Sequence, residues 1–214
     1  MTGRMDIAFM VGGFEVFLKM LFYFLHERGW GKIRWGKQEI QPLVIWITGL
    51  FGAGKTSVAK KVAEELKKLG LKHEHLDGET MRDLLPDTGF SKHEVDEHIK
   101  HVGLLASRLE NVGVFVVASF ISPYQKDRDR ARKLNPAGEY IEVFVKASVE
   151  ICEYRDPKGL YKKAREGIIK EFTGISAPYE EPENHEVEVD TDKLSVEESA
   201  DKIWDYLVST KILQ

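Results

Sequence analysis

Cysteine is almost absent from this chain of 214 residues, and the one present is Cys152. A single cysteine cannot form a disulfide within the chain, and it excludes zinc sites built from several thiolates. Charge of one sign is also scarce, because 31 Lys and Arg residues stand against 35 Asp and Glu residues, a net charge of −4. No broad basic field favours nucleic acid, so residues that bind phosphate must be placed locally. We expect a cytoplasmic protein that acts on small molecules and binds no nucleic acid.

Long apolar runs are confined to the N-terminal part of the chain. The stretch "IAFMVGGFEVFLKMLFYFL", residues 7–25, is interrupted by Glu15 and Lys19, which can pair on one face of a helix. A spanning helix needs about 20 apolar residues with few charges, so this stretch is borderline. No small-residue cleavage site follows it, so we do not expect a secretory signal. We interpret residues 1–41 as an apolar helix and linker that packs on its own domain or a partner. The alternative is a membrane anchor, either a spanning helix or peripheral contact through residues 7–25.

From residue 42 onward, β-rich runs alternate with helical patterns. The expected strands are "LVIWIT", "KHEHLD", "VFVVASF", "YIEVFVKA" and "HEVEVDT". Helical patterns separate them; Ser91 is a candidate N-cap for the longest, and Pro157 breaks another. Strands joined by helical crossovers predict an α/β fold of three layers, with a mostly parallel sheet and helices on both faces. We expect one domain over residues 42–214.

A glycine-rich segment follows the first expected strand directly. "GLFGAGKT", residues 49–56, matches G-x-x-x-x-G-K-[ST] between a strand and a helix. Glycines let successive backbone N–H groups face an anion, and the helix that follows presents its positive end. The segment predicts a P-loop NTPase fold in which Lys55 reaches the β- and γ-phosphates and Thr56 offers its hydroxyl to Mg²⁺. The expected ATP-binding residues here are Gly49, Leu50, Phe51, Gly52, Ala53, Gly54, Lys55, Thr56 and Ser57.

Other segments narrow the choice among phosphate-loop proteins. They are "LDGETMR", "TGFS", "SFISPYQKDRDRAR", "DPKGLYKKAREG" and "KEFTGISAPYEEPENHEVEVDT", in this order. With the phosphate loop, they resemble the adenylylsulfate kinase (APS kinase) family, whose members transfer the γ-phosphate of ATP to the 3′-hydroxyl of adenosine 5′-phosphosulfate (APS). The resemblance covers residues 43 to about 207 and implies this activity, ATP and Mg²⁺ as cofactors, and a homodimer.

Asp77 ends the second expected strand, beside the strand that leads into the phosphate loop. A carboxylate there can hold Mg²⁺ or accept the proton of an attacking hydroxyl, and it can also simply cap a helix. The resemblance gives Asp77 the catalytic role together with Lys55, and it places Ser119 near the transferred phosphoryl group. Thr56 and Asp77 are the expected metal-binding residues.

The resemblance also implies an acceptor site. Its residues would be Arg82, Phe90, His98, Ile99, Lys158, Leu160 and Phe172, with Phe90 and Phe172 stacking on the acceptor adenine and Arg155 bordering the adenine of ATP. From the pattern alone, a surface ion pair is the lesser alternative for Arg82, whereas each of the two phenylalanines is more typical of the core. The basic segment around Lys158 suits a lid that excludes water, or a solvated helix face. We expect "KDRDRARK" to be a solvated helix.

The helix after "TGFS" departs from the family pattern. Val95 stands where the family has arginine and His98 where it has asparagine, and Phe51 replaces a serine of the loop. Two alternatives therefore stay open: a kinase of this fold for another hydroxylated acceptor, and a non-catalytic, nucleotide-binding membrane adaptor. His98 lies on one helix face with Glu94 and His101, which alone do not complete a metal site. His73 and His75 alternate along a strand, where we expect a half-exposed face.

Overall fold

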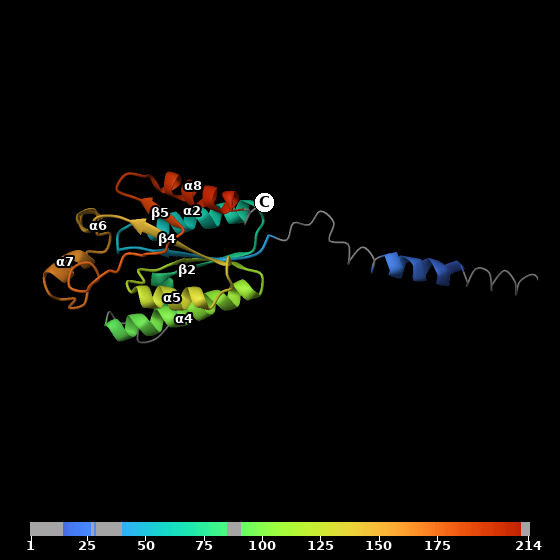
Figure 1. The fold of residues 1–214 in the computed structure, drawn as a ribbon, viewed down its shortest axis with the longest axis horizontal. Coiled ribbons are helices and arrows are strands. Elements are labelled where there is room, and N and C mark those ends of the chain that lie inside the picture. The colour runs from blue at the N-terminus through green and yellow to red at the C-terminus, as the bar shows by residue number, and fades with distance from the viewer. Residues whose placement is uncertain (1–14, 27, 29–39, 85–90, 211–214) are drawn as a thin grey trace, which may run out of the picture. The chain divides into compact units, whose positions relative to one another are not determined.

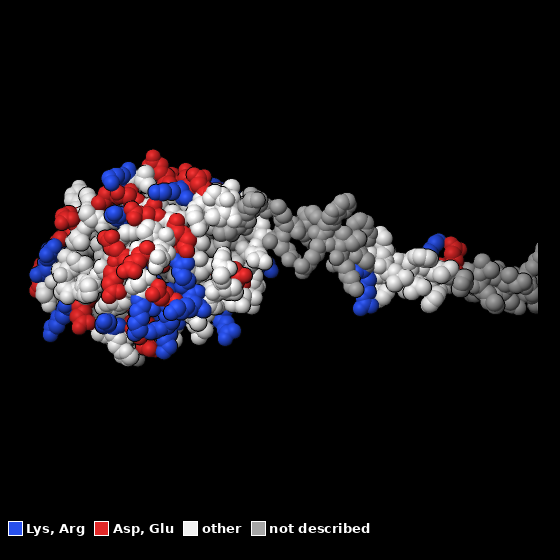
Figure 2. Space-filling model, viewed as in Figure 1, with Lys and Arg blue, Asp and Glu red and all other residues white. Residues whose placement is uncertain are grey.

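In the computed structural model, the structure describes residues 15–26, 28, 40–84 and 91–210. The chain divides into two units, Met1–Glu39 and Ile40–Gln214. In the first unit residues 15–26 form a helix in which Lys19 and Glu15 pair at 2.6 Å. Most of the large apolar side chains of this helix are exposed, and it is largely uncharged in Figure 2. Among the described residues, no helix combines the length and apolarity needed to cross a bilayer.

Strands and helices alternate through the second unit. In chain order the elements are β1 Val44–Thr48, α2 Lys55–Lys68, β2 His73–Asp77, α3 Gly78–Leu84, α4 Lys92–Asn111, β3 Phe115–Ser119, α5 Gln125–Lys133, β4 Tyr140–Lys146, α6 Val149–Arg155, α7 Leu160–Arg165, β5 Val187–Asp190 and α8 Val196–Ser209. The expected strands and crossover helices are confirmed. The sequence did not predict α3, which follows β2 without a loop.

The strands form one parallel sheet in the order β2-β3-β1-β4-β5. Strand β1 is central, with β3 on one side and β4 on the other. Strands β2 and β5 extend the sheet as its edges. Because every pair is parallel, the carboxyl ends of all the strands lie along one edge, where ligands bind in open α/β sheets. This sheet, with helices on both faces, confirms the predicted α/β fold (Figure 1).

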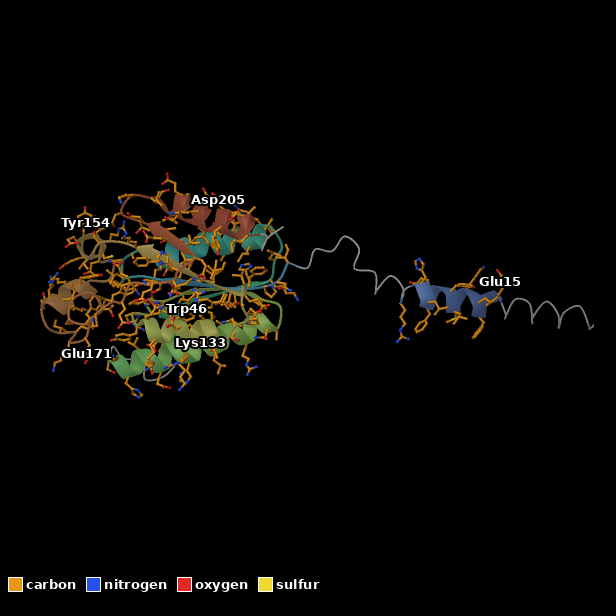
Figure 3. The ribbon with its side chains drawn as sticks, viewed as in Figure 1. Glu15, Trp46, Lys133, Tyr154, Glu171 and Asp205 are labelled. Atoms are coloured by element: carbon orange, nitrogen blue, oxygen red, sulfur yellow. The ribbon has the colours of Figure 1, made fainter. Side chains whose placement is uncertain are left out.

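Alternate residues of β1 enter two separate hydrophobic layers. Ile45 and Ile47 join the layer that α2 and α8 complete, and Val44 and Trp46 join the layer with α4 and α5. The two helix pairs cover opposite faces of the sheet in Figure 1. Trp46 lies between the sheet and α5 (Figure 3), with its ring 5.7 Å from that of Phe120. Burying each such side chain contributes about 1.5–3 kcal/mol, so both layers fix the position of β1.

Two expectations about helices have clear outcomes. Ser91 caps α4 in a capping box with Glu94, as predicted from the sequence. The expectation of a solvated helix at "KDRDRARK" was wrong, because Asp127 and Arg128 of α5 are only 3% and 0% exposed. Helix α5 has few apolar residues, so it packs on the sheet through charged side chains that form ion pairs with residues of the sheet.

Candidate active site

A cavity of about 810 Å³ lies at the carboxyl edge of the sheet. Its walls come from the phosphate loop, the ends of β2 and β3, the first half of α4, the α6–α7 segment and the start of α8. The predicted site residues that line it are Phe51, Gly52, Ala53, Gly54, Lys55, Thr56, Ser57, Asp77, Arg82, His98, Ile99, Ser119, Arg155, Lys158, Leu160 and Phe172. Gly49 and Leu50 lie at the base of the loop and do not line the cavity, and Phe90 lies outside the described residues.

The phosphate loop follows a path that only glycine permits at two points. Gly49 has φ +153°, and a Cβ there would overlap the carbonyl oxygen of Val145. At Gly52, φ is +79° and a Cβ would lie 2.9 Å from the carbonyl oxygen of Cys152. Chain segments on the β4 side thus press against the loop, which leaves its backbone open toward the cavity. Helix α2 begins at Lys55 and directs its N-terminal amides to the same space.

Lys55 is 8% exposed and donates from Nζ to the carbonyl of Leu50 at 2.7 Å. Burial lowers the pKa of Lys55 to about 8, because the charged ammonium loses hydration. An anion beside Nζ would replace that lost hydration and favour the charged form. The lysine is therefore already held at the loop and ready for a polyanion.

Asp77 is the centre of a hydrogen-bond network at the end of β2. Its Oδ2 accepts from the hydroxyls of Thr56 at 2.8 Å and Ser119 at 3.1 Å, and its Oδ1 accepts from the backbone N–H of Glu79 at 3.0 Å. Partial burial alone would raise the pKa of Asp77, but these donors outweigh it and hold the pKa below its usual value. Asp77 is thus an ionised acceptor in contact with the phosphate loop, and it also caps the start of α3.

His75 extends this network by one residue. Its Nε2 lies 3.0 Å from Ser119 Oγ, and burial lowers the pKa of the ring. The expected half-exposed position is confirmed, since the His75 side chain is partly buried. Its contact with Ser119 was missed, because sequence spacing does not show which neighbouring strand pairs with β2.

The side of the cavity opposite the phosphate loop combines Arg82 of α3 with His98 and Val95 of α4. The ring of His98 is 7% exposed, lies 5.7 Å from that of Phe120, and neither nitrogen has a hydrogen-bond partner among the described residues. Burial and the charge of Arg82 lower the pKa of His98 to about 4, so the imidazole is neutral at pH 7. A buried polar group without a partner is costly, and a ligand in the cavity can supply one.

Phe172 serves both as core residue and as cavity wall. It is 2% exposed, and its ring meets that of Tyr161 edge-on at 4.9 Å and that of Phe51 at 6.2 Å. Tyr161 in turn donates to the carbonyl of Phe51 in the phosphate loop at 2.9 Å. These contacts tie α7 and the segment after it to the phosphate loop.

The predicted lid residues belong to the segment that joins α6 and α7, beside the cavity. The chain breaks at Pro157 between α6 and α7, as expected, and Asp156 caps α7 through the N–H of Leu160 at 2.8 Å. Lys158 pairs with Glu79, the second residue of α3. This exposed pair bridges the α6–α7 segment and α3. Such a contact is weak enough to open and close with ligand binding.

Arg155 reaches the loop that follows β5, where it donates to the Thr191 carbonyl at 2.6 Å. Thr191 donates to the carbonyl of Ala53 in the phosphate loop at 2.8 Å. Thr191 and Phe120, both on the cavity, were not predicted. Both residues directly follow a strand, Thr191 after β5 and Phe120 after β3. This position could have identified them as site residues, because ligands bind at this edge of a parallel sheet.

The oxygen atoms of Thr56 and Asp77 are the donors that a hard cation such as Mg²⁺ prefers. No group of three or more His, Cys, Asp or Glu side chains in the described part of the chain could hold a metal alone. The pair suits a cation that also takes oxygens from a bound phosphate.

Comparison with known proteins assigns most of the chain to one family. Residues 41–190 match the family described as adenylylsulphate kinase. An adenylyl-sulfate kinase of Geotalea uraniireducens is 49% identical over 160 residues, 74% of this chain and 77% of the relative. A probable adenylyl-sulfate kinase of Halalkalibacterium halodurans is 46% identical over 172 residues, 80% of this chain and 85% of the relative. Residues 1–31 match a different family, described as a predicted membrane protein (DUF2061).

A solved structure has the same fold. The APS kinase CysC of Mycobacterium tuberculosis, in complex with AMPPNP and APS, superposes with a TM-score of 0.74 at 37% identity. The match covers 78% of this chain and 98% of that one. Together with the family match over residues 41–190, this likeness is decisive. The chain belongs to the adenylylsulfate kinase family.

Proposed function

We propose that this chain transfers the γ-phosphoryl group of ATP to the 3′-hydroxyl of APS. The observation that carries this proposal is the 2.8 Å hydrogen bond between Thr56 and Asp77. It joins the triphosphate-binding loop to a carboxylate that can accept a proton. The cavity of about 810 Å³ continues from this contact to the wall formed by Arg82 and His98, which leaves room for an acceptor.

The phosphate loop holds the donor in this mechanism. Backbone amides from Gly52 to Thr56 face the β- and γ-phosphates, and Lys55 exchanges its bond to the Leu50 carbonyl for a phosphate oxygen. Little covalent chemistry is required of the protein in phosphoryl transfer, so positioning and charge stabilisation supply most of the rate.

Thr56 and Asp77 would hold Mg²⁺, because both present oxygen atoms toward the phosphates. When bound, the ion neutralises charge on the transferring phosphoryl group. Thr56 would offer a lone pair of its hydroxyl oxygen to the ion, and its proton could still be donated to Asp77. Ser119 and the Glu79 amide also donate to Asp77 and hold the carboxylate in place.

Asp77 orients the acceptor hydroxyl and takes up its proton as the new bond forms. Arg82 suits the phosphosulfate of the acceptor, since guanidinium offers forked donors. Phe172 supplies an aromatic wall for the adenine, and Lys158 closes the opening over α3 through Glu79. Closure excludes water, which would otherwise take the phosphoryl group.

The test is transfer from γ-labelled ATP by the purified full chain. We expect label in a 3′-phosphorylated product of APS and far less in a panel of sugars, nucleosides and amino alcohols. Asp77→Asn should bind ATP and transfer almost nothing. Transfer to another alcohol but not to APS would refute the assigned acceptor and favour a different small-molecule kinase. ATP binding without transfer to any acceptor would favour the non-catalytic adaptor.

We further propose that the N-terminal unit contacts the membrane surface, with the kinase unit in the cytoplasm. The match of residues 1–31 to a family described as a predicted membrane protein supports this. The helix of residues 15–26 exposes Phe17, Met20 and Phe22 by 62–69%, which is unusual unless lipid or protein covers them. Lys19 and Glu15 of this helix pair with each other, and most of its large side chains are apolar and exposed.

Vesicle sedimentation tests this second proposal. We expect the full chain to sediment with vesicles of anionic and zwitterionic lipid, and a chain that starts at Gln41 to stay in the supernatant with unchanged kinase activity. The proposal would be contradicted if both chains sedimented with vesicles to the same extent. It would also be contradicted if the full chain sedimented equally with and without vesicles, because aggregation would then explain its sedimentation.

We also propose a homodimer, because members of the family often form dimers. Light scattering of the chain that starts at Gln41 tests whether the kinase unit alone dimerises. A mass of one chain across the accessible concentrations would contradict the proposal.

A further inference from the structure

His75 contacts the catalytic network without lining the cavity. It lies on β2 two residues before Asp77, so both side chains leave the same face of the strand. Asp77 pairs in register with Ser119 on β3. The His75 Nε2 atom, 3.0 Å from Ser119 Oγ, therefore approaches the network from the sheet side, behind the reacting groups.

The hydrogen bonds of Ser119 fix which atom of His75 carries a proton. A serine hydroxyl has one proton, and an ionised carboxylate only accepts. Since Ser119 lies 3.1 Å from Asp77 Oδ2, it must donate that proton to Asp77. Its oxygen can then only accept from His75, so His75 must carry its proton on Nε2.

This chain of donors also limits what Asp77 can do. A carboxylate has about four lone-pair positions. Thr56, Ser119 and the Glu79 amide donate to three of them in the structure, so few directions remain for a cation and for an acceptor hydroxyl. Those directions depend on Ser119 staying turned toward Asp77 rather than rotating toward the phosphates.

We propose that His75 is a positioning residue: its Nε2–H holds the Ser119 hydroxyl in the orientation that donates to Asp77. Asp77 thereby keeps a single orientation toward the acceptor hydroxyl. The inference rests on the proposed function, but it concerns a residue outside the cavity. On this proposal, His75 affects the chemical step and does not affect ATP binding by the phosphate loop.

Substitutions at His75 separate the donor from the side-chain volume. His75→Leu removes the donor, and we expect kcat to fall about 10-fold, as for other partners that orient a reacting group, while the KM for ATP is unchanged. His75→Gln keeps an N–H near the place of Nε2 and should restore most of kcat. The matched control is His73→Leu on the same strand face; His73 Nδ1 lies 3.0 Å from the Leu71 carbonyl oxygen, and the variant should behave as the parent.

A double-mutant cycle tests whether the effect passes through Ser119. In the Ser119→Ala background, His75→Leu should cause no further loss of kcat. The same 10-fold loss in that background would overturn the proposal, as would a Gln variant as slow as the Leu variant. Thermal melting of each variant accompanies the kinetics, so that a loss of folded protein is not read as a loss of kcat.

Nitrogen NMR of the imidazole groups in the full chain gives a readout that needs no substrate. We expect the Nε2–H tautomer at His75, and its signal should shift in Ser119→Ala but not in His73→Leu. An Nδ1–H tautomer would refute the inference even in an active enzyme. Failure of the parent to phosphorylate any acceptor would refute the proposed function instead, so the two failures are distinct.

Discussion

Arg128 on α5 and Glu142 on β4 form an ion pair of 2.7 Å, and neither side chain is more than 1% exposed. Arg132 adds a contact to Glu142 at 3.3 Å. Arg128 also donates to the carbonyls of Ser122 and Glu180, both at 2.7 Å. The Arg128 guanidinium thus joins α5, β4 and two loops, and the loop that contains Ser122 lines the cavity.

Removal of the Arg128 guanidinium should strongly destabilise the folded chain. Arg128→Met leaves Glu142 buried with only Arg132 beside it, and we expect a loss of about 3–5 kcal/mol in the free energy of unfolding, measured with urea. The matched control is Arg165→Met, which breaks the exposed pair with Glu153 at 2.8 Å and should change stability very little. Similar small losses for both variants would show that the buried pair is not needed.

Stability should depend on pH through Asp127. Burial and the neighbouring Asp96 raise the pKa of Asp127 to about 7. An unfolded Asp titrates near pH 4, so between pH 4 and 7 the folded chain holds a proton that the unfolded chain has released. The contribution is present at low pH and is lost as the pH rises through 7.

Asp127→Asn keeps a neutral side chain at every pH. After allowance for the lowered pKa of Asp96, the variant should be about 1–2 kcal/mol more stable than the parent at pH 8, with the difference closing toward pH 5. Denaturant unfolding at pH 5, 6.5 and 8 measures this. The exposed Asp201→Asn should follow the parent. A stability curve for Asp127→Asn that runs parallel to the parent's across this pH range would count against the assignment.

His98 should show opposite effects on stability and on function. His98→Leu removes two buried nitrogens without partners among the described residues, so we expect the unfolding free energy to stay equal or rise by about 1 kcal/mol. The KM for APS should rise about 10-fold with the KM for ATP unchanged, because an acceptor hydrogen bond is lost. A stable variant with an unaltered KM for APS would mean that His98 does not contact the acceptor.

The phosphate loop should not tolerate a side chain at Gly49. Gly49→Ala combines a positive φ with overlap of the Val145 carbonyl, so we expect loss of ATP binding and of more than about 2 kcal/mol in stability. Gly138→Ala is the control, because its φ of +92° is also positive but nothing lies within 4 Å of its Cβ. It should lose about 1 kcal/mol and still bind ATP by calorimetry.

Local patterns predicted most of the fold. The alternation of β-rich and helical runs, the Ser91 cap and the break at Pro157 depend on neighbouring residues, and each appears in the structure. Helix α5 was misjudged because burial depends on what a helix packs against. Its charged residues meet Glu142 and Glu186, which are distant in sequence.

The candidate site was predictable where a motif sets the geometry. The loop with Lys55 and Thr56, and Asp77 at the end of β2, came from spacing and resemblance. Thr191 and His75 were not predicted as site residues, because they contact residues on other parts of the sheet, and the order of the strands cannot be read from one sequence. That order, with β3 between β2 and β1, is what brings Ser119 to both Asp77 and His75.

The place of β1 at the middle of the sheet has a consequence for how such an enzyme changes over time. The phosphate loop follows β1, which pairs with a strand on each side, whereas Asp77 and the helix that carries Arg82 follow β2, which pairs with β3 on one side only. We therefore expect substitutions around β2 to alter the acceptor side of the cavity with little effect on the phosphate loop. On this expectation, an enzyme of this architecture can acquire a different acceptor while it retains ATP as the phosphoryl donor.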